Sequence, residues 1–297
     1  MALSVPERRE SQADGAAAEA AQFARTLEAE SGAGTLDVPS FPDVAVRVRR
    51  ALSDDNAGAE TVVRVVGSEP ALAARVLQLA NSAALNTTRR RITDLRTAIT
   101  RLGFIMVRSA AIAFAVVQLR KAAALKGLER ELDRLWKRCT LVAALAYAVA
   151  RRFTRINADT ALLAGLLHGI GRLYILTRAN RFPVVRATPG AYQAIERDWH
   201  VRIARCVLAG WETPPEIVQA IVHHEDLERD HDGPPDLTDV LCVATLLASH
   251  GKNPELLELE LSSVGACRRM QLDLDLCRAL LEESQVEVAE LSHALGP

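Results

Sequence analysis

The apolar stripe between Leu128 and Val149 is the feature that most constrains the fold of this chain. Its members step by four and three residues: Leu128, Leu132, Leu135, Cys139, Val142, Ala146 and Val149. This spacing places every member on one face of a helix over about six turns. No segment shows the alternation of a half-buried strand, and aromatic residues make up only 4% of the chain. We therefore predict an all-α protein with one continuous helix across this stretch.

Other helical signals divide the chain into three parts. The expected helices cover residues 71–80, 95–102, 158–168, 171–178, 200–211, 214–224 and 236–250, with two more segments from about residue 254. Residues 36–250 are predicted to form the packed domain and residues 251–297 a helical extension. Residues 1–35 carry few large apolar side chains, so we expect an arm that is partly helical or flexible, with a helix around residues 16–30.

Composition excludes several function classes. The 36 basic residues are balanced by 37 acidic ones, so no overall charge favours nucleic acid or an acidic membrane. The basic clusters Arg47, Arg49, Arg50 and Arg89-Arg90-Arg91 are interpreted as solvated faces. The five cysteines show no CxxC spacing, and no apolar run reaches the ~18 residues that span a bilayer. We expect a cytoplasmic protein without nucleic-acid or membrane binding.

Several segments resemble, in order, the signatures of the HDOD family, the HD-related output domains. They are residues 71–82 with the ending Asn81-Ser82, residues 92–99 with Leu102-Gly103, Leu135-Trp136, residues 164–171, Trp211 with Pro214, and His223-His224. The resemblance implies an HD-like multi-helix bundle and a bacterial signalling role beside response regulators or cyclic-di-GMP turnover proteins. Because the flanking segments are too short to hold such a domain, we expect these partners to be separate proteins. The oligomeric state stays open.

The metal-binding chemistry of HD phosphohydrolases is largely missing from this chain. In those relatives a His, a His-Asp pair and a later Asp hold a divalent metal that activates water. The resemblance places Arg138 at the first His, His168 and Gly169 at the pair, and Thr245 at the final Asp. A guanidinium has no free lone pair and repels a cation. We predict no metal, no other cofactor and no catalysis.

Two interpretations of the remaining histidines stay open. His200, His223 and His224 resemble the additional histidines that hold a second metal in HD phosphodiesterases, and with His168 they could suit zinc or nickel. This would leave a degenerate metal-dependent phosphohydrolase. The sequence favours structural roles instead, with His200 beginning a helix and His223-His224 near a helix C-terminus, where the dipole favours them.

Arg138 also has two interpretations. It borders the apolar stripe, and a buried cation needs a partner, for which we name Glu196. Alternatively, Arg138 and Arg172 line a phosphate pocket with His168 and His200, which would make the protein a nucleotide sensor of the cyclic-di-GMP type. In the C-terminal extension, Leu276, Leu280, Val286 and Leu291 are expected to pack on the domain rather than on a partner.

Overall fold

A computed structural model describes residues 5–295 except 33, 35, 37, 39–42, 54–57, 87–89, 120–121 and 123–124; the side chains of residues 5–14, 44, 49 and 53 are also outside the description. Every regular element in this described part is a helix, so the predicted all-α class is confirmed. The helices are α1 Val5–Ser31, α2 Asp43–Ser53, α3 Ala59–Gly67, α4 Pro70–Ala80, α5 Leu95–Leu119, α6 Glu129–Phe153, α7 Ala158–Leu167, α8 Ile170–Leu176, the 3-10 turn η2 Ala179–Arg181, α9 Pro183–Ala187, α10 Ala191–Gly210, α11 Pro215–His223, α12 Leu237–His250, α13 Pro254–Ser263, α14 Gly265–Arg269, α15 Leu274–Glu283 and α16 Gln285–Leu295.

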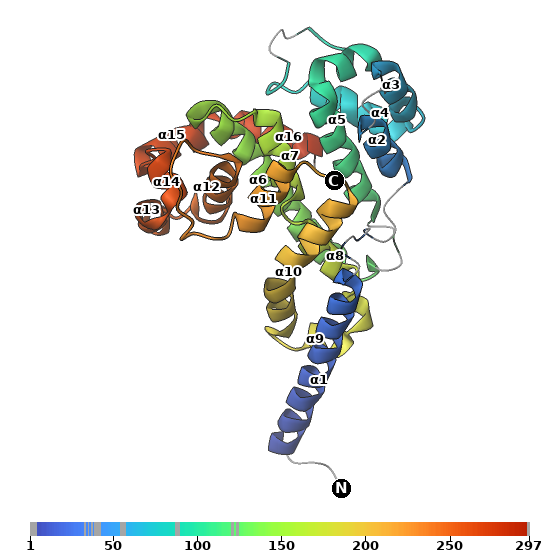
Figure 1. The fold of residues 1–297 in the computed structure, drawn as a ribbon, viewed down its shortest axis with the longest axis vertical. Helices are drawn as coiled ribbons and strands as arrows, with labels where there is room; N and C mark the ends of the chain where they lie inside the picture. The colour runs from blue at the N-terminus through green and yellow to red at the C-terminus, as the bar shows by residue number, and fades with distance from the viewer. Residues whose placement is uncertain are drawn as a thin grey trace.

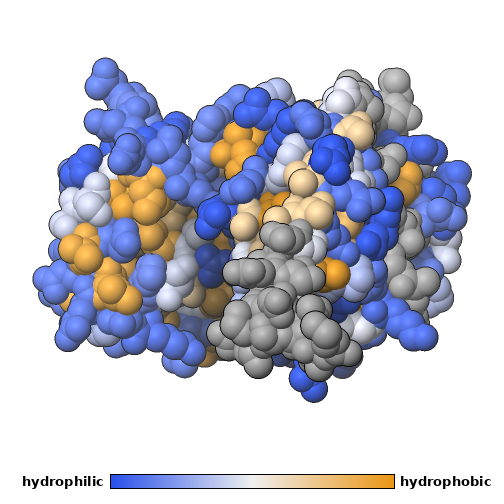
Figure 2. All heavy atoms as spheres, turned by 90° about the horizontal axis from the view of Figure 1, so that it is seen from below, coloured by the Kyte–Doolittle hydropathy of each residue, from blue (hydrophilic) through white to orange (hydrophobic). Residues whose placement is uncertain are grey.

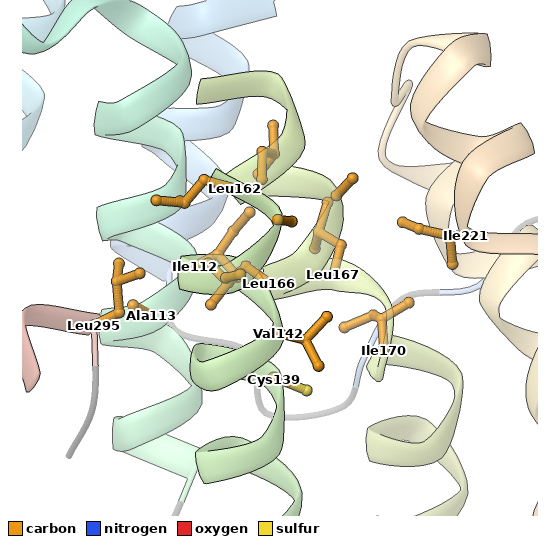
Figure 3. Packing of buried hydrophobic residues seen from close by; sticks show 14 of the residues in the cluster. Ile112, Ala113, Cys139, Val142, Leu162, Leu166, Leu167, Ile170, Ile221 and Leu295 are labelled. Atoms are coloured by element: carbon orange, nitrogen blue, oxygen red, sulfur yellow. The ribbon is translucent and has the colours of Figure 1, made fainter. Parts of the chain in front are cut away.

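Helix α6 is the central helix of the fold. Its span confirms the helix predicted from the apolar stripe. It packs against α7, α8, α12 and α16 (Figure 1). Its contact with α7 is close, because a Cβ added at Gly165 would lie 2.5 Å from Cα of Ala143. Figure 3 shows Val142 and Cys139 of α6 beside Ile170, which begins α8. Small residues on α6 and α7 therefore let the two backbones approach each other.

Helices α2 to α5 form a separate bundle at the upper right of Figure 1. Within α5 the backbone leaves the helical region at Gly103, with φ of 73° and ψ of 169°. The predicted end of a helix at Gly103 is thus confirmed, although a second helical stretch follows at once. Asn81, after α4, donates to the carbonyls of Leu77 and Ile92 and accepts from the Ile92 amide. The Asn side chain of the signature therefore ties the start of the 81–92 loop to its end.

Helix α1 is docked more firmly than the predicted arm. The side chains of Phe23 and Leu27 are fully buried against the rest of the fold. Phe23 stacks on Phe182 with ring centroids 4.1 Å apart. The Glu30 carboxylate accepts hydrogen bonds from the Tyr174 hydroxyl and from Arg178. Two large apolar residues and one half-buried carboxylate hold the helix, which composition alone did not reveal.

The C-terminal helices return to the domain. Helix α16 contacts both α6 and α4, and the carbonyl of Leu295 accepts from Trp136 Nε1 and from Arg75. Leu280 and Leu291 are buried, so the predicted packing of these two residues is confirmed. The same prediction is wrong for Leu276 and Val286, which are 37% and 66% exposed. Their helices present those positions outward because the opposite faces supply the core contacts.

One predicted helix start is wrong. Helix α10 begins at Ala191, after Gly190 with a left-handed φ of 81°, so His200 lies in the middle of the helix rather than at its start. The glycine ends the preceding turn and reverses the chain, a signal that the sequence interpretation passed over.

The remaining surface and hydropathy predictions can be placed as well. Arg47, Arg50, Arg90 and Arg91 are exposed as predicted, while Arg89 and the side chain of Arg49 lie outside the described residues. Two helical stretches, Leu95–Leu119 and Ala158–Arg181, are long and apolar enough to cross a bilayer. Their apolar windows are 67% and 89% buried within the fold, as in the core helices of a folded domain.

Candidate functional site

The four positions at which the resemblance expects metal ligands come from three helices that pack together. Arg138 lies on α6, His168 and Gly169 join α7 to α8, and Thr245 lies on α12. The Arg138 guanidinium donates to Ser249 Oγ at 3.0 Å. Thr245 Oγ1 donates to the carbonyl of Leu241 at 2.8 Å, within its own helix. The Arg138 guanidinium has no lone pair for a cation, and neither side chain is the His or Asp that the resemblance expects at its position.

Gly169 is packed against α6 so closely that an added side chain would require the side chains of Cys139 and Leu135 to shift. A Cβ at this position would lie 2.5 Å from Cys139 Sγ and 3.2 Å from Leu135 Cδ1. The thiol itself is buried, and burial raises the pKa of Cys139 to about 12. The space that an aspartate would need is therefore occupied by an inert thiol from the neighbouring helix.

His168 is a buried neutral imidazole. Its Nδ1 lies 2.6 Å from the carbonyl of Gly165, and its ring meets the ring of His224 edge-on with centroids 5.5 Å apart. Burial, and then the neighbouring His224, lower the pKa of His168 to about 3. The ring is thus fixed by a backbone hydrogen bond and an aromatic contact.

His224 and His200 point toward one carboxylate. The Nδ1 of His224 lies 2.8 Å from the carbonyl of Ile221, and its buried Nε2 has no hydrogen-bond partner. That Nε2 is 3.6 Å from Glu225 Oε1, whereas His200 Nε2 is 3.0 Å from Glu225 Oε2. Burial is the main cause that lowers the pKa of His224 to about 4. His223 is exposed and does not join this group.

Glu225 is the central residue that sequence reasoning missed. It accepts from Arg172 at 2.7 Å and faces His200, and these two partners hold its pKa well below its usual range, the hydrogen bond from His200 contributing most. The predicted ion pair between Arg138 and Glu196 is absent from the described residues, where Arg138 bonds to Ser249 and Arg172 pairs with Glu225. Glu225 follows a helix end in an exposed loop, where no spacing pattern marks it.

The four predicted histidines do not form a metal-sized cluster. A metal site needs at least three His, Cys, Asp or Glu side chains whose ligand atoms lie close together. Among the described residues, the group whose ligand atoms lie within 4.8 Å of one another is His231, Asp236 and Asp239. The buried Asp239 is paired there with Arg229 at 3.0 Å and Arg269 at 2.7 Å. Because these guanidiniums occupy its oxygens, the cluster serves as an ion-pair network that holds the start of α12 against α14.

A cavity of about 420 Å³ opens beside Arg138 and Arg172. Helices α6, α8 and α10 supply most of its wall. Of the predicted pocket residues, Arg138 and Arg172 line it, while His168 and His200 are buried and do not. The lining residues are Leu128, Glu131, Arg134, Leu135, Arg138, Arg172, Leu176, Ala179, Arg186, Tyr192, Gln193 and Glu196.

Comparisons with known proteins agree with this fold. The family model described as "HDOD domain" matches residues 38–227. The chain is similar to a solved "Putative metal-dependent phosphohydrolase" from Shewanella amazonensis, with 23% identity, a TM-score of 0.75, and coverage of 94% of this chain and 99% of that one. It is also similar to an "HDOD domain protein with unknown function" from Geobacter sulfurreducens, with 23% identity, a TM-score of 0.60, and coverage of 91% and 97%.

A further structure bears on the biological context. The chain is similar to a "Putative signal transduction protein" from Marinobacter aquaeolei, with 21% identity and a TM-score of 0.57, covering 96% of this chain and 66% of that one. No curated protein matches the chain. At these identities the structural likeness shows the fold alone.

The contact between Gly169 and Cys139 can be tested by a double-mutant cycle. Gly169→Ala should lower the free energy of unfolding by about 1–3 kcal/mol, because the new methyl group meets the thiol. Cys139→Ala in the same chain should recover most of this loss, since it removes the sulfur. Urea denaturation of the wild type, both single variants and the double variant measures the coupling. Additive effects would show that the thiol is not the obstacle.

The neutral histidines predict a loss of stability in mild acid. The pKa values of His168 and His224 are lowered to about 3 and about 4, against about 6.5 in an unfolded chain. As the pH falls from about 6.5 toward 4, the unfolded chain binds protons that the folded chain does not. The free energy of unfolding should then fall by up to about 1.4 kcal/mol per pH unit for each histidine.

Urea denaturation at pH 7, 6 and 5 checks this slope. Glu225 adds its own loss only below about pH 4.5, because its pKa is lowered rather than raised. The matched control is the double variant His168→Gln with His224→Gln, in which the slope between pH 7 and 5 should flatten. An unchanged slope in that variant would assign the acid sensitivity to other groups.

Proposed function

Because the chain belongs to the HDOD domain family, we propose that it is a non-catalytic bacterial signalling protein that acts by binding other proteins. The single observation that carries this proposal is Gly169 at the position of the metal-bridging carboxylate, packed so that an added Cβ would lie 2.5 Å from Cys139 Sγ. Arg138 and Thr245 support it, since the first brings a positive charge and the second spends its hydroxyl on its own helix. Of the four positions at which the resemblance expects ligands, His168 alone carries a side chain of the expected type, which supports a function without water activation by a metal.

The proposed partners are separate signalling proteins, such as response regulators or cyclic-di-GMP turnover proteins, in the cytoplasm. Family membership supports this class of partner, as does the name of the Marinobacter aquaeolei neighbour. A domain without chemistry can transmit a signal only through contacts that depend on its conformation or occupancy.

The exposed face of helix α13 is the surface that we propose to test first for partner binding. Leu256 and Leu259 are 45% and 65% exposed, whereas Leu257 and Leu261 of the same helix are buried in the core. Figure 2 shows apolar side chains at the left edge of the molecule, the side on which Figure 1 places α13 to α15. Because the helix is anchored by its other face, the two exposed leucines can be changed without opening the core.

The absence of catalysis can be tested with a chromogenic phosphodiester. The purified protein, given bis-p-nitrophenyl phosphate with Mn²⁺, Ni²⁺ or Fe²⁺, should release nitrophenol at the same rate as a His168→Gln variant with matching circular dichroism. The reason is that His168 is the one residue kept at the four predicted ligand positions. Metal-stimulated turnover that disappears in His168→Gln would establish a hydrolase and reject the proposal.

Partner binding can be tested by affinity capture from the native cell followed by mass spectrometry. The wild type should enrich proteins with receiver domains or cyclic-di-GMP turnover domains. The variant Leu256→Lys with Leu259→Lys should capture these about tenfold less, because two charges replace the exposed apolar contacts. Val286→Lys is the matched control, since Val286 is equally exposed on α16. Failure to enrich any signalling protein over an unrelated helical bait would contradict the proposal.

A further inference from the structure

The cavity between α6, α8 and α10 carries more positive than negative charge. Its wall holds Arg134, Arg138, Arg172 and Arg186, against two carboxylates, Glu131 and Glu196. Arg134 lies 3.9 Å from Glu131 on the surface, and Arg172 pairs with Glu225. The remaining arginines are Arg138 and Arg186, and the excess positive charge of the wall is therefore concentrated on these two.

Those two arginines bind only neutral groups in the described part of the chain. Arg138 donates to Ser249 Oγ at 3.0 Å, and Arg186 donates to Asn180 Oδ1 at 2.6 Å. Each guanidinium has five N–H donors, so most of its donor capacity faces the cavity or solvent. Burial is the main cause that lowers the pKa of Arg138, followed by the like charge of Arg172, while Glu225, which pairs with Arg172, opposes the shift.

Tyr192 adds a neutral donor to the same wall. Its hydroxyl is buried and has no hydrogen-bond partner, and burial raises the pKa of Tyr192, so the group stays protonated. A buried hydroxyl without a partner costs free energy, which an incoming acceptor would recover. One turn away on α10, Glu196 also lines the cavity, and burial raises its pKa. This carboxylate opposes an anion, so its removal is a sensitive test.

The rest of the wall is apolar. Leu128, Leu135, Leu176 and Ala179 line it beside the charged residues. The volume of about 420 Å³ lies within the range of sites that hold small organic molecules. A ligand that satisfies both parts of the wall carries a compact anion at one end and an uncharged body at the other.

We propose that this cavity binds a small organic phosphate, with the phosphate held by Arg138, Arg172 and Arg186 and the organic body placed on the leucine wall. A phosphate group offers several acceptor oxygens to forked guanidinium donors. The site adds a small-molecule input to the protein and does not depend on which protein partner it contacts.

Arg172 connects this cavity to Glu225 and to the two buried histidines beside that carboxylate. Its guanidinium lines the cavity and at the same time pairs with Glu225, which in turn faces His200 and His224. A bound phosphate competes with Glu225 for Arg172. Occupancy of the cavity therefore weakens a link between α8 and the segment that follows α11, which is a route from ligand to conformation.

The test is isothermal titration calorimetry on the full chain in a phosphate-free, low-salt buffer. The probes are 5′-GMP, cyclic di-GMP, inorganic phosphate and guanosine. We expect a phosphate ester to bind and guanosine to give no heat, because the anion supplies most of the affinity. Binding by 5′-GMP identifies a mononucleotide-sized site, and binding by cyclic di-GMP identifies a larger one. Inorganic phosphate that binds as tightly as either ester would overturn the role of the leucine wall.

Four variants test which residues hold the ligand, and each has an expected direction of change in affinity. Arg138→Gln should weaken binding about tenfold to a hundredfold, and Tyr192→Phe severalfold, since each loses a donor. Glu196→Gln should tighten binding, because it removes a like charge. Arg130→Gln is the matched control, as Arg130 is exposed on α6 but does not line the cavity.

The outcomes separate clearly. All four variants should retain the thermal midpoint of the wild type to within a few degrees, which excludes misfolding as the cause of weaker binding. No heat from either phosphate ester at millimolar concentration would overturn the proposal. Equal affinities in Arg138→Gln and Arg130→Gln would do the same. Either failure leaves the capture of protein partners unaffected, so the two proposals are judged separately.

Discussion

The close approach of α6 to α7 and α8 is the constraint on which the rest of the structure depends. Gly165 lets α7 lie against Ala143, Gly169 lies against Cys139, and a Cβ at Gly171 would strike the carbonyl of His200 on α10. Three glycines in seven residues thus fix where two neighbouring helices lie. Dense packing of this kind does not adjust to an added side chain without moving a backbone. The same contact that builds the core therefore involves the glycine that stands where the resemblance expects the metal-bridging aspartate.

That contact also determines the electrostatics of the neighbourhood. His168 and His224 are buried as neutral rings bound to backbone carbonyls. The negative charge of Glu225 is balanced by Arg172 and by the hydrogen bond with His200. A buried or half-buried carboxylate needs such partners, and here a guanidinium and an imidazole take the place that a metal would fill. The cluster is stable as an arrangement of protein groups alone.

The sequence predicted those parts of the molecule whose structure depends on residues close together in the chain. The stripe from Leu128 to Val149 yields α6, and Gly103 ends a helix, because helical periodicity and glycine both act within a few residues. Residues whose role depends on distant neighbours were not predictable in this way. Glu225 pairs with Arg172 across a long stretch of chain, and the partner guessed for Arg138 was wrong for the same reason. Docking of α1 through Phe23 likewise depends on Phe182, which no local pattern connects to it.

Under the proposed function, loss of hydrolysis does not require loss of recognition at the same place. A divalent metal in such a site does two things, since it attracts phosphate oxygens and lowers the pKa of a bound water. A guanidinium can perform the first task with directed hydrogen bonds but not the second, because it has no vacant coordination position to accept a lone pair from water. Arg138 and Arg172 stand on the wall of the cavity, where their charge remains available to an anion. On the two proposals made above, arginines at a former metal position would hold a phosphate ester without cleaving it. A protein that transmits a signal by contact needs a ligand that stays bound and intact.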